Sequence, residues 1–283
     1  MAEINAVGIV GTGVMGAGLA EVVATAGYHV VARSRSRDGV DAVVATVTAS
    51  LERQVAKGAL EASERDGVLA RITATDDLAD LAECDLVIES IVEELTAKRT
   101  LFAELEEVVK PSAILATNTS TLPVNEQARM TQRPDKVCGI HFFNPAPLMK
   151  LVEVVRPITA SDDTVKSALA FATTCGKDAI EVVDRAGFVV NALLFPFLNS
   201  AVRMFEQGTA LMEDIDTAMC AGCNFPMGPF ALLDLVGLDT SVAILDALYE
   251  EFHDAQYAAA PTLRRKVAAG QLGRKSGVGF YRY

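Results

Sequence analysis

One histidine and one glutamate stand out as a possible proton-transfer pair. His141 lies near the end of an apolar, strand-like run from Val137 to Phe143, and the turn residues Asn144-Pro145-Ala146-Pro147 follow it. A second β-branched run, Leu151-Val152-Glu153-Val154-Val155, then carries a single acid. A buried carboxylate is costly without a partner, and folding the second run back along the first would bring Glu153 to His141. An imidazole held by a carboxylate is suited to exchange a proton near neutral pH.

A glycine-rich loop near the N-terminus has the sequence context of a dinucleotide site. The apolar run from Ile4 to Val10 predicts a buried strand, and Gly11-Thr12-Gly13-Val14-Met15-Gly16 separates it from a helical stretch, Leu19 to Ala26. The first glycine would allow a tight turn, the second would let backbone approach a pyrophosphate, and the third would allow close helix packing. The positive end of the helix would face the phosphates. We therefore expect dinucleotide contacts from Gly11, Gly13, Val14, Met15 and Gly16.

The residues after the second predicted strand, Tyr28 to Ala32, bear on which dinucleotide is bound. NAD sites usually carry an acid there that binds the ribose hydroxyls. In this chain Ser34 takes the expected position, and Arg33 and Arg35 flank it. Because guanidinium groups suit phosphates, we expect these three residues to contact the cofactor and NADP(H) to be preferred over NAD(H). The alternative is a solvated basic turn with NAD still bound.

The remaining N-terminal pattern predicts an open parallel sheet with helices on both faces. Apolar residues spaced by three and four from Val40 to Val55 predict a helix, and Glu61 to Ala70 predicts a second, so a helix pair is inserted after the second strand. Further strands are predicted at Leu86 to Glu89 and Ile114 to Thr117, and a helix at Leu95 to Val109. Residues 1–183 are therefore predicted to form a Rossmann-like, doubly wound α/β domain.

After Asp184 the pattern becomes helical, which predicts a smaller all-α domain over residues 184–283. Helices are predicted at Ala186 to Met204, Glu213 to Cys220, Phe230 to Leu235, Thr240 to Phe252 and Thr262 to Ala269. The first of these is apolar nearly all round, so it must be buried in this domain or against a second subunit. We expect a homodimer formed through these C-terminal helices.

Composition excludes several classes of partner. The chain has 283 residues and a net charge of −12, which argues against a nucleic-acid partner. No apolar run is long enough to span a bilayer, and no secretion signal is recognised, so we expect a cytoplasmic protein without a membrane partner. The pair Cys220 and Cys223 has no second pair or nearby histidine, so no metal site is expected and the five cysteines are interpreted as reduced thiols.

Taken in order, the motifs of this chain resemble the 3-hydroxyacyl-CoA dehydrogenase family in its short, 3-hydroxybutyryl-CoA dehydrogenase form. The resemblance covers essentially the whole chain. It is carried by Gly11-Thr12-Gly13-Val14-Met15-Gly16, Asp85-Leu86-Val87-Ile88-Glu89, Ala116-Thr117-Asn118-Thr119-Ser120, His141-Phe142-Phe143-Asn144-Pro145, Met149-Lys150-Leu151-Val152-Glu153-Val154-Val155, Gly187-Phe188-Val189-Val190-Asn191, Pro226-Met227-Gly228-Pro229, Val236-Gly237-Leu238-Asp239 and Lys275-Ser276-Gly277-Val278-Gly279-Phe280-Tyr281.

The resemblance implies catalytic roles for four residues. His141 would be the general base for hydroxyl oxidation and the acid for ketone reduction, and Glu153 would orient it and stabilise its protonated form. Ser120 and Asn191 would hydrogen-bond substrate oxygens. The implied reaction interconverts 3-hydroxyacyl and 3-oxoacyl thioesters by hydride transfer with a nicotinamide cofactor.

The resemblance also implies binding residues outside this group. Dinucleotide contacts are implied for Glu93, Lys98, Asn144 and Lys275. Arg53 and Lys57 match positions that hold the phosphates of coenzyme A. Their spacing of four places them on one helix face, which is also what two solvated charges would show.

Two departures and three rival hypotheses remain. Ala192 stands where the family often has arginine, and the acid expected at position 34 is absent. The thioester substrate could be carried by acyl carrier protein instead of coenzyme A. Other two-domain hydroxyacid dehydrogenases share the fold but generally use a catalytic lysine, which the His141/Glu153 pair disfavours. A dinucleotide-binding scaffold without turnover would have no need of Ser120, His141, Glu153 and Asn191 together.

Overall fold

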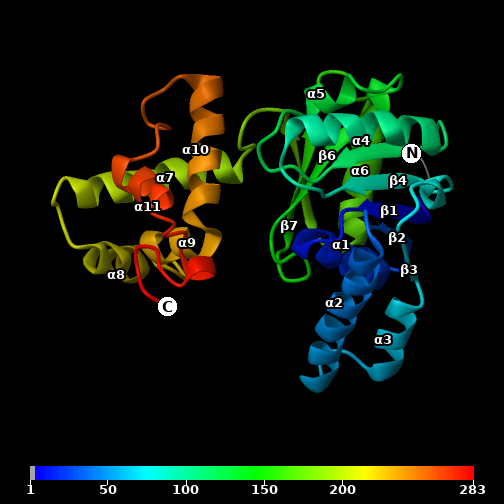
Figure 1. The fold of residues 1–283 in the computed structure, drawn as a ribbon, viewed down its shortest axis with the longest axis horizontal. Coiled ribbons are helices and arrows are strands. Elements are labelled where there is room, and N and C mark those ends of the chain that lie inside the picture. The colour runs from blue at the N-terminus through cyan, green and yellow to red at the C-terminus, as the bar shows by residue number, and fades with distance from the viewer. Residues whose placement is uncertain (1–3) are drawn as a thin grey trace. The chain divides into compact units, whose positions relative to one another are not determined.

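A mixed eight-stranded sheet organises the first unit of the chain, Met1–Asp184 (Figure 1). The strand order is β3-β2-β1-β4-β5-β6-β7-β8, and the strands from β3 to β6 are parallel. β7 runs antiparallel to β6, and β8 is parallel to β7. The strands are β1 (Ala6–Val10), β2 (His29–Arg33), β3 (Ile72–Thr75), β4 (Leu86–Glu89), β5 (Ile114–Thr117), β6 (Val137–Phe142), β7 (Leu151–Arg156) and β8 (Asp178–Val183).

The structure is a computed structural model that describes residues 4–283. The part of the secretion-signal prediction that concerns residues 1–3 lies outside the described residues. Among the described residues, no helix combines the length and the apolar character that crossing a membrane requires.

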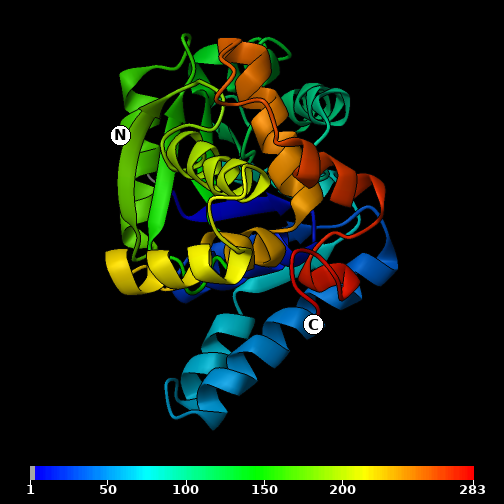
Figure 2. The ribbon, with the colours of Figure 1, turned by 90° about the vertical axis from the view of Figure 1, so that its left-hand side faces the viewer.

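Six α-helices lie among the strands of the first unit in the described chain. They pack apolar faces on a sheet whose central strands β1, β4, β5 and β6 are almost wholly buried, as parallel strands covered on both faces must be. Two of them, α2 and α3, project away from the sheet as a hairpin of helices (Figures 1 and 2). The helices are α1 (Val14–Thr25), α2 (Arg37–Ala56), α3 (Ala62–Leu69), α4 (Leu95–Val108), α5 (Val124–Ala128) and α6 (Asp162–Thr174).

The predicted fold class is confirmed, although the sheet is mixed and not wholly parallel. The inserted helix pair is present, and strand order grows outwards from β1 in both directions, as in a doubly wound sheet. The antiparallel β7 is reached by the short turn after His141, because a few residues can join only antiparallel neighbours.

The second unit, Arg185–Tyr283, has a helical core of its own. Its first helix begins at Val190, so the predicted start at Ala186 is wrong: Gly187 and Phe188 have φ of 71° and 47°, in the left-handed region that a right-handed helix excludes. The α-helices of this unit are α7 (Val190–Glu206), α8 (Met212–Cys223), α9 (Pro229–Val236), α10 (Leu238–Phe252) and α11 (Pro261–Ala268).

The first helix is not buried on all sides within one chain, so of the two predicted alternatives only burial against a second subunit could cover its remaining apolar side chains. Phe195, Leu198 and Val202 are buried in the core of the unit, but Leu193 is 72% exposed. Val189, just before the helix, is 42% exposed. α7 therefore keeps an apolar strip that the described chain does not cover.

Candidate active site

The antiparallel pairing of β6 and β7 sets His141 directly opposite Glu153. The Nδ1 atom of His141 lies 2.8 Å from Oε2 of Glu153, within hydrogen-bond distance. Glu153 is fully buried and His141 is 3% exposed. Because the two side chains share one face of a buried sheet, the carboxylate fixes the ring by way of Nδ1 and leaves Nε2 as the atom that can exchange a proton.

Ser120 lies on the Nε2 side of the same imidazole. Its Oγ is 3.1 Å from Nε2 of His141, and the residue is half-buried in the loop after β5. The structure thus brings three of the predicted catalytic residues into one line, Ser120–His141–Glu153. A substrate oxygen placed near Ser120 Oγ would also lie near the proton-exchanging nitrogen.

Glu93 holds the loop that carries Ser120. Its Oε1 accepts the backbone N–H groups of Ser120 at 2.9 Å and Thr121 at 3.3 Å, and the hydroxyl of Thr119. Its Oε2 lies 3.0 Å from the ammonium of Lys98. Burial raises the pKa of Glu93, but the Lys98 charge and these donors outweigh burial and leave the pKa below its usual value. The carboxylate is therefore anionic at neutral pH and anchors the Ser120 backbone.

Glu89, for which no role is predicted from the sequence, completes this cluster. It is fully buried at the end of β4 and accepts two hydrogen bonds from Lys98 Nζ, at 2.7 and 2.9 Å, and one from the Thr117 hydroxyl at 2.7 Å. Lys98 itself is 1% exposed on α4. One ammonium thus bridges the buried carboxylate of Glu89 and the 40% exposed carboxylate of Glu93, which compensates the burial of the Lys98 and Glu89 charges. The signal in the sequence was an acid ending the apolar run Leu86 to Glu89.

Asn118 is a second residue that the motif-based prediction left without a role. Its Oδ1 accepts the backbone N–H of Phe142 at 2.8 Å, next to His141. This bond ties the end of β5 to the end of β6. It therefore sets the spacing between the Ser120 loop and the histidine.

The glycine loop after β1 fits a dinucleotide pyrophosphate. Gly11 has φ of 106°, and a Cβ on Gly16 would lie 1.7 Å from the Gly11 carbonyl oxygen, so both positions require glycine. Gly13 has open space where a Cβ would be and caps α1 without a side-chain hydrogen bond. Val14 is 76% exposed, and Met15 is half-buried. The first-turn N–H groups of a twelve-residue helix thus face outward, as an anion-binding helix end does.

The end of β2 combines a buried serine with basic side chains. Ser34 is 7% exposed, and a Cβ on Gly39 of α2 would lie 1.9 Å from its Oγ and 3.2 Å from Thr12 Oγ1 of the glycine loop. Ser34 therefore lies between that loop and the start of α2. Arg35 is exposed and Arg33 is half-buried with its Nε buried and without a partner in the described chain. Ser34 stands at the position where an NAD site would carry the acid.

The remaining predicted residues lie apart from the histidine or in the other unit. Asn144 is exposed in the loop after β6, while Arg53 in the last turn of α2 and Lys57 at its C-cap are exposed on the helix pair. Asn191 is 8% exposed on α7, and Lys275 pairs with Asp239 at 2.6 Å; both belong to the second unit.

Two stretches of the chain match the two domains of one enzyme family. Residues 6–185 match the NAD binding domain of 3-hydroxyacyl-CoA dehydrogenase, and residues 187–283 match the C-terminal domain of the same enzyme. The chain belongs to the 3-hydroxyacyl-CoA dehydrogenase family. The family, fold class and reaction predicted from the sequence are confirmed: the chain is an oxidoreductase that interconverts 3-hydroxyacyl-CoA and 3-oxoacyl-CoA with a nicotinamide cofactor.

Individual members of the 3-hydroxyacyl-CoA dehydrogenase family resemble this chain along its whole length. The 3-hydroxybutyryl-CoA dehydrogenase of Mycobacterium tuberculosis is 48% identical over 282 residues, which cover 99% of each chain. The enzyme of the same name from Clostridioides difficile is 42% identical over 275 residues, covering 97% of this chain and 98% of the relative. The crystal structure of (S)-3-hydroxybutyryl-CoA dehydrogenase from Ralstonia eutropha matches with a TM-score of 0.97, at 42% identity and 99% coverage of both chains.

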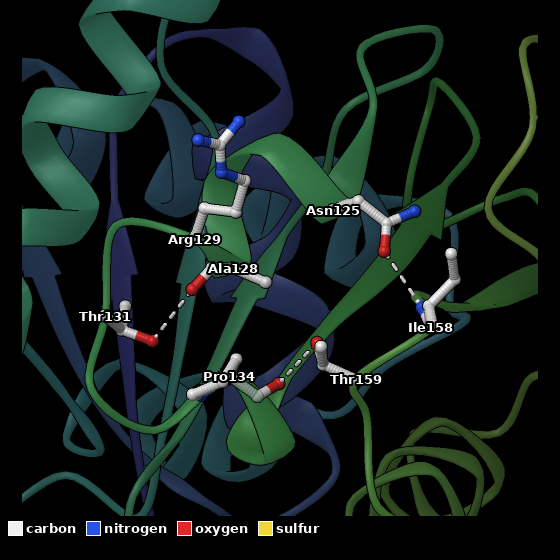
Figure 3. A pocket seen from close by; sticks show the side chains of 7 residues that line it. All are labelled: Asn125, Ala128, Arg129, Thr131, Pro134, Ile158 and Thr159. Atoms are coloured by element: carbon white, nitrogen blue, oxygen red, sulfur yellow. Dashed lines mark hydrogen bonds between the residues drawn. The ribbon is translucent and has the colours of Figure 1, made fainter.

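The first unit also has a surface pocket at the end of β6 opposite to His141. It lies where β6 begins and β7 ends, and Asn125, Arg129 and Ile158 contribute to its lining (Figure 3). Asn125 accepts the backbone N–H of Ile158 at 2.9 Å, so its amide ties two chain segments together. The pocket contains none of the predicted catalytic residues.

The cysteines of the dehydrogenase form no metal cluster with other side chains in the described chain. Cys220 and Cys223 both lie on α8, and all five thiols are unpaired with one another. Burial raises the pKa of the Cys138 thiol to about 12, which makes it a poor nucleophile.

Proposed function

We propose that this enzyme oxidises 3-hydroxybutyryl-CoA and reduces acetoacetyl-CoA, with His141 as the proton-exchanging residue and NADP(H) as the preferred cofactor. The observation that carries the proposal is the His141 ring, with Nδ1 on the buried carboxylate of Glu153 and Nε2 beside Ser120. The names of the similar enzymes point to the four-carbon substrate. The nicotinamide supplies or accepts the hydride when it is bound.

Oxidation of a secondary alcohol removes a hydride from C3 and a proton from the 3-oxygen. Nε2 of His141 receives that proton, and Glu153 holds the ring so that this nitrogen faces the substrate. Ser120 donates its hydroxyl to the 3-oxygen and places it near Nε2. Asn191 keeps the role that the resemblance implies, a second hydrogen bond to a substrate oxygen. Reduction runs through the same atoms in reverse.

The first unit binds the dinucleotide in this proposal. The pyrophosphate lies on Gly11, Gly13, Val14, Met15 and Gly16, at the exposed start of α1. Glu93, beside the Ser120 loop, and Asn144, after β6, contact the nicotinamide half, and the buried Lys98 acts by way of Glu93. Lys275 keeps the dinucleotide contact that the resemblance implies.

The preference for NADP(H) rests on the end of β2. An NAD site places a carboxylate there, and this chain places Ser34 between Arg33 and Arg35. Neither arginine is engaged in an ion pair within the described residues, so both guanidinium groups can bind the 2′-phosphate. The first turn of α2 adds N–H groups beside them.

The coenzyme A phosphates bind at Arg53 and Lys57 in this proposal. Both are exposed at the far end of α2, on the helix pair that projects from the sheet (Figure 2). A carrier-protein thioester would replace the phosphorylated nucleotide by a protein surface. Comparing acetoacetyl-CoA with acetoacetyl-carrier protein as substrates therefore distinguishes the two carriers.

The C-terminal unit provides the dimer contacts in this proposal. Leu193 of α7, 72% exposed, and Val189 just before it form an apolar strip that water covers in a single chain. Pairing of two such strips about a twofold axis would bury them.

Reduction of acetoacetyl-CoA, followed by the absorbance of the reduced nicotinamide, tests the proposal. Runs with NADPH and NADH in parallel should give turnover with both and a higher kcat/KM with NADPH. No turnover with either cofactor would overturn the proposed substrate, and a clearly higher kcat/KM with NADH would overturn the cofactor preference. Acetoacetyl-carrier protein in a third arm tests the rival substrate.

A further inference from the structure

Lys177 has a buried ammonium group whose hydrogen-bond partners in the described chain are backbone carbonyls. It lies between α6 and β8 and is 9% exposed. Its Nζ donates to the carbonyl oxygens of Ala146 at 2.7 Å and Met149 at 2.9 Å. Burial lowers the pKa of Lys177, and Cys175 is the one charge-capable group that opposes this shift. The cation is therefore solvated by the protein backbone and not by a carboxylate.

Such a group is costly to bury, since two carbonyl dipoles replace its water only in part. Lys98, the other buried lysine beside the site, has two carboxylate partners. A methionine at position 177 would fill the same space without that cost. The buried ammonium group therefore does not serve to stabilise the fold, and its role is to be sought in the residues that it holds in place.

The carbonyls that Lys177 binds belong to the loop between the two catalytic strands. This loop, residues 143–150, joins β6 with His141 to β7 with Glu153, and it contains Asn144. The N–H groups of Leu148 and Met149 both donate to the Pro145 carbonyl at 3.0 Å, so the loop forms a single turn. Lys177 takes up two carbonyls of that turn, as a cation does at a helix C-terminus.

The opposite side of the loop packs on the phosphate-loop helix. A Cβ placed on Gly18 of α1 would lie 3.3 Å from the Ala146 Cβ and 3.4 Å from Pro147 Cδ. Figure 1 shows the loop beside α1, where β7 begins. The turn at Ala146 is thus held between Lys177 and the second turn of the helix whose N-terminus faces the dinucleotide phosphates.

We propose that Lys177 is a positioning residue that fixes the β6–β7 loop against α1 and thereby sets the distance between Asn144 and the phosphate loop. The inference rests on the proposed function in one respect, the contact between Asn144 and the dinucleotide. Loss of the ammonium frees two carbonyls and removes the support of the turn, while the His141–Glu153 pair in the strands keeps its register.

Lys177→Met tests the proposal, with Lys166→Met on the exposed face of α6 as the matched control. Amide hydrogen exchange read by mass spectrometry should show lost protection in residues 143–150 of the Lys177→Met enzyme. The NADPH dissociation constant should rise by about tenfold or more, the effect of losing one hydrogen bond to a charged group. The KM for acetoacetyl-CoA should stay within about threefold, since the strand pair is intact. Lys166→Met should behave as wild type.

Unchanged loop protection together with an unchanged NADPH dissociation constant in Lys177→Met would overturn the proposal. Equal losses of NADPH and acetoacetyl-CoA affinity would also overturn it, because they indicate a general structural role. If circular dichroism shows that Lys177→Met does not fold, the same measurements are made on Lys177→Gln, which keeps N–H donors without the charge. Failure of the wild type to bind either dinucleotide would overturn the proposed function. Amide hydrogen exchange in residues 143–150 would still show whether Lys177 holds the loop.

Discussion

The end of the β6–β7 pair and the end of β2 are built in opposite ways. At the first, His141 and Glu153 are buried, directly opposed in the sheet and hydrogen-bonded to each other. At the second, Arg35 is exposed, and the Nε of Arg33 is buried without a partner in the described chain. In the proposed function, the proton-exchanging group is positioned by contacts within the protein, while the basic end of β2 keeps a donor that a bound phosphate would engage. In this proposal the catalytic geometry is therefore fixed before binding, and cofactor choice is left to the contacts that form on binding.

The largest effect is expected from His141→Gln. Glutamine can hydrogen-bond to Glu153 and Ser120 but cannot exchange a proton, so kcat for acetoacetyl-CoA reduction should fall by about 10²- to 10⁴-fold. Cofactor binding, measured by fluorescence titration, should stay near wild type. His29→Gln, at the exposed start of β2, is the matched control and should keep full activity. A wild-type kcat in His141→Gln would show that the end of the β6–β7 pair does not carry the proton transfer.

A smaller loss is expected from Glu153→Gln. The ring remains in place but loses the charged partner on Nδ1, so kcat should fall by roughly a hundredfold or less. Steady-state kinetics measure it, and Glu181→Gln on the exposed neighbouring strand β8 serves as the control. A loss greater than that of His141→Gln would mean that the carboxylate, and not the imidazole, limits the reaction.

Substitutions at the end of β2 should alter the choice between NADPH and NADH without impairing proton transfer at His141. Ser34→Asp restores a carboxylate where the ribose hydroxyls bind and repels a 2′-phosphate, so the ratio of kcat/KM for NADPH to that for NADH should fall by about tenfold or more. Arg35→Ala should move the ratio in the same direction, whereas Arg129→Ala on the exposed surface should not. An unchanged ratio in both variants would show that this region does not select the cofactor.

The smallest effect is expected at the exposed helix pair. Arg53→Ala with Lys57→Ala should raise the KM for acetoacetyl-CoA by roughly three- to tenfold, because exposed ion pairs are weak. The KM for acetoacetyl-N-acetylcysteamine, which lacks the coenzyme A phosphates, should not change. An equal rise for both thioesters would place the phosphates elsewhere.

Elements that are buried on both sides could be predicted from the sequence, and edge elements could not. β1, β4, β5 and β6 are continuous apolar runs because parallel central strands are covered by helices. β3 and β8 end the sheet, and β8 is largely exposed, so their side chains carry no such pattern. The late start of α7 depends on the left-handed backbone at Phe188. That conformation could not be predicted from the sequence, because bulky apolar residues rarely adopt it.

The candidate site divides in the same way. A single acid within a β-branched run can be recognised in the sequence, so Glu153 and its partner His141 could be paired from the sequence alone. The bridge from Glu89 through Lys98 to Glu93 joins a strand end, a helix and a loop, and only the packed sheet brings them together. Lys177 likewise acts on a loop 28 to 31 residues earlier in the chain.

Single-turnover reduction measures proton transfer by His141 separately from cofactor binding and product release. Enzyme loaded with NADPH is mixed with acetoacetyl-CoA, and the loss of the reduced nicotinamide is followed in wild type, Glu153→Gln and His141→Gln. Cofactor binding is complete before mixing, so the rate at saturating acetoacetyl-CoA reports on hydride and proton transfer. The rate is expected to decrease in that order, with His141→Gln slower than wild type by about 10²-fold or more. A His141→Gln rate close to that of wild type would contradict the assignment of the proton to His141.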